Sequence, residues 1–123
     1  MSKYYCLILI FSLASCYQPT RNCSDYKTGS FTFDYVVDGE TKTGRFTRDD
    51  KYSVEYYENK VDSATVRWIN DCEFVLKSID EQTSIHFKIL ETTEKNYTFE
   101  YRNAIRNPKK KLIVKKGTAT KTN

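Results

Sequence analysis

The chain has 123 residues, of which 29% are charged and 15% aromatic, and its formal net charge is +4. This length suits one domain with a single hydrophobic core. The aromatic content, together with only four glycines and two prolines, excludes an intrinsically disordered chain.

The first segment in chain order is a short apolar run over residues 6–14, preceded by Lys3. A membrane-spanning helix needs about 20 apolar residues, so this run is too short to cross a bilayer. A basic start, a short apolar centre and a small-residue exit are typical of a secretory signal peptide. The letters LASC at 13–16 resemble the lipobox of bacterial lipoproteins. This resemblance implies that residues 1–15 are removed and that Cys16, the first mature residue, carries a lipid.

Ordinary signal cleavage after Ala14 is the alternative, and it would leave Cys16 as a free thiol. The cysteine count favours the lipobox, because the mature chain would keep Cys16, Cys23 and Cys72, an odd number. With Cys16 lipidated, Cys23 and Cys72 can form a disulfide in an oxidising envelope. A reactive or metal-binding pair would need further ligands, and we expect neither a metal nor a cofactor.

Residues 16–27 are polar and contain Pro19, and we expect them to form a tether to a β-domain over 28–123. Alternating apolar residues, the period of a strand, predict eight short strands. They cover 30–37, 42–48, 52–58, 64–70, 73–79, 84–90, 96–102 and 111–116. Turns are expected at Asp38-Gly39, at 49–51, over 59–63 and over 80–83.

The predicted fold is therefore all-β: a single antiparallel up-and-down meander of about eight strands. Closure into a barrel or half-barrel, lipocalin-like in architecture, would remove exposed strand edges. In the third strand, Tyr52, Val54 and Tyr56 share one face. The aromatic residues that would line a ligand cavity, or else fill a core, are Phe31, Phe33, Trp68, Phe87 and Phe99.

Two functional classes follow from this interior. Small barrels are either packed solid or hold one small ligand. A chain of this size with many aromatics favours the packed interior, and with it a structural or interaction role. The alternative is a binding module for a small apolar or lipid ligand.

No catalytic activity is expected. The only histidine, His86, lies out of phase with the apolar face of its strand, and no nucleophile or phosphate-binding motif accompanies it. Asp71 and Glu73 flank Cys72 and could form an acid/base or cation site, although such pairs are more often solvated turn residues.

Charge is unevenly distributed along the chain. Residues 16–101 carry a net charge of −5, whereas residues 102–123 contain eight basic residues and no acidic one. The basic end could bind anionic lipid headgroups or envelope proteins, or it could simply be solvated. Nucleic acid is not an expected partner, because an exported protein meets little of it.

The mature chain is similar to a group of small uncharacterised envelope lipoproteins of the flavobacterial kind. The matching residues are Cys23, Lys27, Thr28, Gly29, Phe31, Trp68, Asp71, Cys72, Glu73, Leu76 and Gly117. The group has no established activity; some members carry a DNA topoisomerase label, for which this chain shows no active-site tyrosine context. Tyr17 rather than Asp follows Cys16, and no acidic residue precedes Asp25. By the sorting patterns of bacterial lipoproteins, this implies an anchor in the outer membrane with the domain on the periplasmic side.

Overall fold

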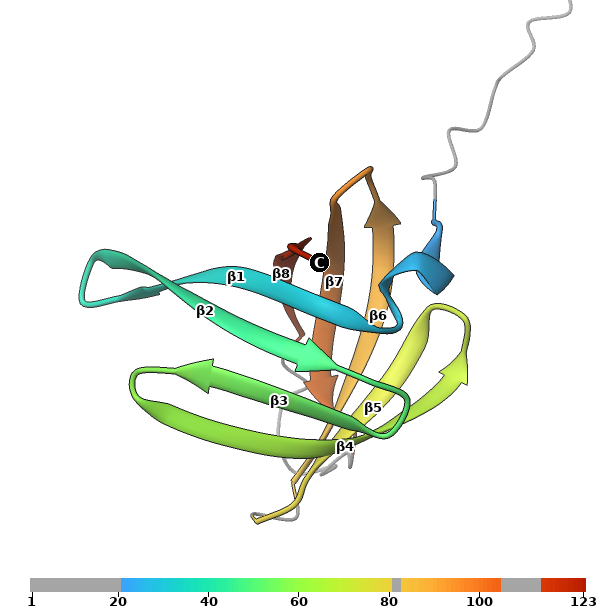
Figure 1. Ribbon diagram of the computed structural model, residues 1–123, viewed down its shortest axis with the longest axis horizontal. Coiled ribbons are helices and arrows are strands. Elements are labelled where there is room, and N and C mark those ends of the chain that lie inside the picture. Colours follow the sequence, from blue (N-terminus) through green and yellow to red (C-terminus); the bar gives the residue numbers. More distant parts are fainter. Residues whose placement is uncertain (1–20, 81–82, 105–113) are drawn as a thin grey trace, which may run out of the picture.

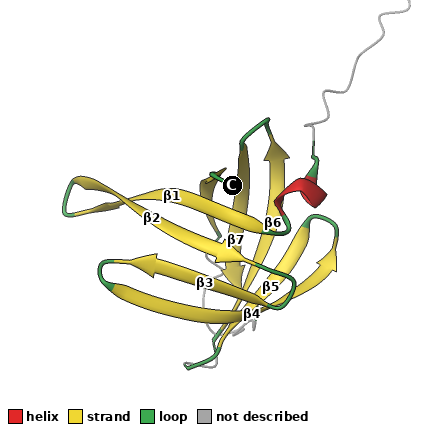
Figure 2. Cartoon of the chain, in the orientation of Figure 1, coloured by secondary structure: helices red, strands yellow, loops and turns green. Residues whose placement is uncertain are grey.

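The computed structural model describes residues 21–80, 83–104 and 114–123. Eight antiparallel strands follow one another around a closed barrel, and the last strand pairs with the first (Figure 1). This confirms the predicted up-and-down meander. The strands are β1 (Gly29–Val37), β2 (Glu40–Arg48), β3 (Tyr52–Tyr57), β4 (Lys60–Asn70), β5 (Glu73–Ser78), β6 (Ser84–Thr92), β7 (Asn96–Asn103) and β8 (Lys115–Lys121). A 3-10 helix, η1 (Cys23–Tyr26), precedes them (Figure 2).

The predicted signal peptide, residues 1–15, and Cys16 lie outside the described residues. In the part of the chain that is described, no helix is both long enough and apolar enough to cross a membrane.

The β1–β2 and β3–β4 hairpins turn through pairs of residues with positive φ. Asp38 and Gly39 (φ 52° and 79°) form the predicted turn between β1 and β2. The next turn uses Glu58 and Asn59 (φ 48° and 61°), so β4 begins at Lys60. The prediction of a turn over 59–63 was therefore wrong. Asn tolerates the left-handed conformation, and a two-residue turn of this hand matches the strand twist, so the chain re-enters the sheet at once.

The last strand lies further along the chain than predicted. We expected it over 111–116, but β8 spans Lys115–Lys121. Its inward residues are small because large residues of β7 face them: Gly117 pairs with Phe99 and Ala119 with Tyr97. A Cβ atom on Gly117 would lie 2.8 Å from Cζ of Phe99. The inward residues of β8 are therefore recognised by the space they leave for an aromatic ring of β7, and not by an apolar pattern in the sequence.

The buried core fills the end of the barrel that η1 covers. Tyr26, Phe31, Phe74, Ile89 and Tyr97 are each at most 2% exposed and belong to this core. The hydroxyl of Tyr26 donates a hydrogen bond to the carbonyl oxygen of residue 93 at 2.6 Å, which ties η1 to the turn before β7.

The predicted disulfide between Cys23 and Cys72 is present, with 5.2 Å between the Cα atoms. It joins η1 to the β4–β5 turn. Because Cys23 and Tyr26 are buried, the predicted boundary at residue 28 is wrong, and the folded body already includes η1. The sequence predicted a tether here because the residues around Cys23 are polar. Cys23 and Tyr26 are nevertheless buried and close one end of the barrel.

The opposite end of the barrel is less completely paired. Strands β2 and β3 pair only over Arg45–Arg48 of β2, although β2 extends back to Glu40. Strands β1 and β8 pair only over Phe31–Phe33 of β1. Beyond these short seams the β1–β2 and β3–β4 hairpins diverge (Figure 1). The barrel is thus plugged at one end and looser at the other.

Candidate binding site inside the barrel

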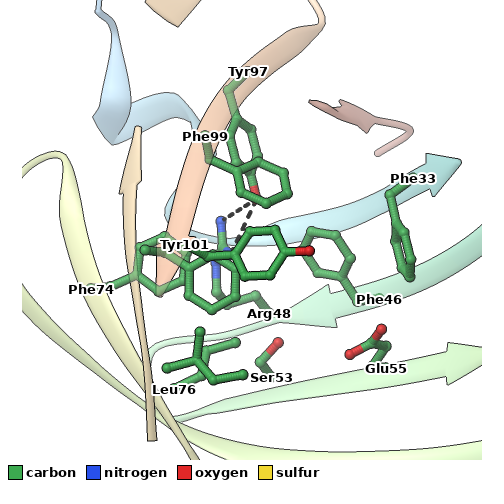
Figure 3. A pocket seen from close by; sticks show the side chains of 12 residues that line it. Phe33, Phe46, Arg48, Ser53, Glu55, Phe74, Leu76, Tyr97, Phe99 and Tyr101 are labelled. Carbon is green, nitrogen blue, oxygen red and sulfur yellow. Dashed lines mark hydrogen bonds between the residues drawn. The ribbon is translucent and has the colours of Figure 1, made fainter. Parts of the chain in front are cut away.

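A cavity of about 280 Å³ lies inside the barrel. Alternate residues of six strands point into it, as the two-residue period of a strand requires. The lining residues are Phe33, Phe46, Arg48, Ser53, Glu55, Phe74, Leu76, Ile85, Phe87, Tyr97, Phe99 and Tyr101 (Figure 3). Nine of these twelve are aromatic or aliphatic, so the wall is mostly apolar with three polar side chains.

The five aromatic residues predicted from the sequence divide into two groups. Phe33, Phe87 and Phe99 line the cavity. Phe31 and Trp68 belong to the packed end instead. The ring of Phe31 stacks on that of Phe46 with 4.9 Å between centroids, and Trp68 packs on Phe74 at 4.6 Å. Period-two reasoning places a residue on the inner face but does not say how deep along the barrel axis it lies.

The polar lining of β3 was not predicted. The sequence suggested Tyr52, Val54 and Tyr56 as the apolar face, but Ser53 and Glu55 are the residues that face the cavity. The pairing register is the cause. Residues directly opposite on neighbouring strands share a face, and Ser53 lies opposite Arg48 while Glu55 lies opposite Phe46. The inward position of Phe46 and Arg48 on β2 therefore turns Ser53 and Glu55 inward as well.

Arg48 forms the floor of the cavity, at the boundary with the packed end. Its side chain is almost completely buried, with 4% of the residue exposed. Nε donates to the carbonyl oxygen of Lys27 at 3.0 Å, and one terminal nitrogen donates to the carbonyl oxygen of Tyr26. Both terminal nitrogens lie 3.4 Å from the hydroxyl of Tyr97 (Figure 3). Arg48 thus holds the end of η1 and the residue after it against the barrel.

Aromatic rings surround the same guanidinium group. Its central carbon lies 4.6–5.8 Å from the centroids of five rings, those of Phe31, Phe46, Trp68, Phe74 and Tyr97. The faces of aromatic rings attract a cation, which offsets part of the cost of removing the charge from water. Burial raises the pKa of Tyr97, and the nearby charge of Arg48 lowers it only in part. The Tyr97 hydroxyl is therefore neutral at physiological pH.

Glu55 is the second charged group in the wall, and it is half-buried. Burial among apolar groups raises the pKa of its carboxyl above the ordinary value of 4.5, and the negative charge of Asp62 raises it further. Asp62 lies directly opposite Glu55 on β4. Two carboxylates on one face disfavour each other's charged form.

Replacing Glu55 by Gln is expected to stabilise the protein at neutral pH. A raised pKa means that the folded state binds the proton more tightly than the unfolded state does. The ionised carboxyl therefore destabilises the folded state. This destabilisation is absent below pH 4.5, where the carboxyl is protonated in both states, and it is complete at a pH above the raised pKa of the folded state. Denaturant unfolding should therefore show a Glu55→Gln advantage at neutral pH that disappears in acid. The control is Asp62→Asn, which should lower the pKa of Glu55 in an NMR titration; an advantage that persists in acid would contradict this account.

Asp71 and Glu73 do not form a joint site. Asp71 is exposed and makes an ion pair with Lys27 at 3.3 Å. Glu73 accepts a hydrogen bond from the Asn70 amide at 3.2 Å and lies 3.6 Å from Nε2 of His86. The side chain of His86 is only 14% exposed, although it lies out of phase with the apolar face that the sequence predicts for its strand.

The basic end of the chain is only partly described, since residues 105–113 are not. Lys115 and Lys116 are exposed on β8. Lys121 instead folds back onto η1, where its Nζ donates to the carbonyl oxygen of Asp25 at 2.6 Å. Among residues 21–80, 83–104 and 114–123, no three His, Cys, Asp or Glu side chains gather in a way that could hold a metal ion.

Comparisons with protein-family models, with curated proteins and with solved structures found no match.

Proposed function

We propose that this protein is a non-enzymatic binding module that holds a small, mostly apolar ligand inside its barrel. The cavity of about 280 Å³ is the observation that carries the proposal. Ligand pockets have volumes of roughly 300–1,000 Å³ and walls that are mainly hydrophobic and aromatic, with a few polar groups. This cavity lies at the small end of that range and has such a wall.

The sequence favoured a filled interior and a structural role. Close-packed protein cores contain few voids larger than a water molecule. The space lined by Phe33, Leu76, Phe87 and Phe99 is much larger than that and partly open to solvent, so a ligand could enter it, which favours the alternative of a binding module. The described lining residues include no histidine or cysteine. Their polar side chains, Arg48, Ser53 and Glu55, can orient a bound ligand through hydrogen bonds and charge.

Straight-chain primary alcohols from hexanol to decanol provide the test, because they carry no charge. Each added CH₂ that the cavity accepts should contribute about 0.8 kcal/mol, roughly fourfold in affinity, until the cavity is full. Isothermal titration calorimetry should show this rise and then a plateau. Ser53→Phe, which places a ring in the cavity, should abolish binding.

Val54→Phe is the matched control. It adds the same ring to the same strand on the opposite face, since Ser53 and Glu55 face inward. This variant should bind the alcohols as the wild type does. Absence of binding to every alcohol by the wild type, or equal loss in both variants, would refute a ligand site in the barrel.

The proposal includes the envelope location expected from the sequence, with an anchor on Cys16 in the outer membrane and the barrel in the periplasm. The Cys23–Cys72 disulfide supports it, because that bond leaves Cys16 as the one unpaired cysteine of a chain cleaved after residue 15.

Cys16→Ala should eliminate incorporation of a fatty-acid probe in cells, because the lipid would attach to that thiol. Cys6→Ala, which changes a cysteine within the removed segment, should leave incorporation intact. Full labelling of the Cys16→Ala protein would refute attachment of the lipid to that thiol, and a wild type without label would point to ordinary signal cleavage instead.

A further inference from the structure

The positive charge of Arg48 has no anionic partner within the described part of the chain. The ion pairs there involve Lys27, Lys42 and His86, and none involves Arg48. Its hydrogen-bond acceptors are two carbonyl oxygens and the neutral hydroxyl of Tyr97. Buried charges in proteins are normally paired, because removing an ion from water costs several kcal/mol even after relaxation.

Arg48 also keeps a donor for a ligand. A guanidinium group has five N–H groups. Four hydrogen bonds are formed, and two of them share the Tyr97 hydroxyl at 3.4 Å, longer than a strong hydrogen bond. Because that hydroxyl accepts from Arg48, its own O–H remains available to donate. Arg48 and Tyr97, respectively 4% and 2% exposed, meet at the floor of the cavity (Figure 3).

The other polar groups of the wall give the cavity a direction. Ser53 lies opposite Arg48, and Glu55 lies two residues further along β3, about 7 Å away along the strand. Asp62, opposite Glu55, adds a second carboxylate at that level. An anionic group is therefore attracted to the floor and repelled from the region of Glu55.

We propose that the ligand is an amphiphilic monocarboxylic acid whose carboxylate binds Arg48 and Tyr97 and whose apolar body lies along the aromatic wall. This inference rests on the proposed function. One buried cation balances one negative charge, whereas the second charge of a phosphate would remain buried without a partner. A carboxylate has two acceptor oxygens, so it can accept from the remaining N–H group of Arg48 and from the hydroxyl of Tyr97 at the same time. The aromatic side chains of β6 and β7 then contact the chain or ring of the acid.

Three probes of equal length test the charge preference on the unaltered protein: octanoic acid, 1-octanol and octylamine. Calorimetry at neutral pH should show that octanoate binds about tenfold or more tightly than octanol, the effect of a hydrogen bond to a charged group. Octylamine should bind most weakly. The preference for the acid over the alcohol should shrink as the pH falls and the probe itself becomes protonated.

Tyr97→Phe keeps the ring but removes one of the two donors, so it should reduce the acid-over-alcohol ratio several-fold. Tyr56→Phe removes a hydroxyl from the outer face of β3 and should leave the ratio unchanged. Equal affinity for all three probes, or tightest binding of the amine, would overturn this inference while the proposed function stands. Failure of all three to bind would refute both.

Discussion

Replacing Cys23 and Cys72 together by Ser is expected to lower the free energy of unfolding by about 4 kcal/mol. The two cysteines are separated by 49 positions, and the chain-entropy model assigns about 4 kcal/mol to a closed loop of that length. The bond also fixes η1, which buries Tyr26 against the core. Denaturant unfolding monitored by circular dichroism would measure the loss.

Reductant provides the control for this variant. The wild-type protein in reductant should fall to the stability of the double variant, whereas the double variant itself should not respond. A wild type that keeps its full stability, with both thiols shown to be free by alkylation and mass spectrometry, would contradict the expected role of the disulfide.

Replacing Arg48 by Met should lower the free energy of unfolding by about 3 kcal/mol. The change leaves the carbonyl oxygens of Tyr26 and Lys27 without their donor. An unsatisfied buried acceptor costs about 1–3 kcal/mol. Part of this loss is offset because the variant no longer pays the desolvation free energy of a buried charge, and a methionine side chain needs no hydrogen-bond partner.

Arg67→Met is the matched control, since Arg67 is an exposed residue of β4. It should change stability by no more than about 0.5 kcal/mol. Arg48→Lys should be intermediate, because an ammonium group can reach one of the acceptors but cannot span all of them as the planar fork does. An Arg48→Met protein as stable as the wild type would mean that the cost of the buried charge equals everything its hydrogen bonds contribute.

These two changes should not be additive. Arg48 holds the carbonyl oxygens of the last residue of η1 and of the residue after it, and the disulfide holds the start of η1. Loss of either attachment weakens the other, so the combined variant should lose less than the sum of the two separate effects.

Most of the fold was predictable because the two faces of most strands, such as β1, differ strongly in polarity. The alternation of Phe31 and Phe33 with Thr32 and Asp34 defines β1, and Asp38-Gly39 defines its turn. Strand β8 was misplaced because its inward residues, Gly117 and Ala119, are small. Their role becomes visible only when Phe99 and Tyr97 are known to face them.

The candidate site was harder to predict than the fold. Phe33, Phe87 and Phe99 were recognised by their apolar character, but Arg48, Ser53 and Glu55 have the composition of a surface. Only the three-residue connection between β2 and β3, which fixes their register, identifies these polar residues as internal. Phe31 and Phe33 face inward at different depths along the barrel axis, so one is packed in the core and the other lines the cavity. This difference depends on η1 and the disulfide, which close the end of the barrel nearer to Phe31.

The short seam between β1 and β8 bears on the order of folding. Its pairs join residues about 90 positions apart, whereas every other strand pair is a hairpin of neighbours in sequence. Distant pairs carry the greatest loop-closure entropy, so the seven hairpins can form from local contacts while the barrel is still an open, curled sheet. Backbone hydrogen bonds from Thr122 to Ser30 and from Ser30 to Asn123 then complete the seam. A cavity that can retain a ligand would therefore exist only after this last event, once residues 115–123 have met β1.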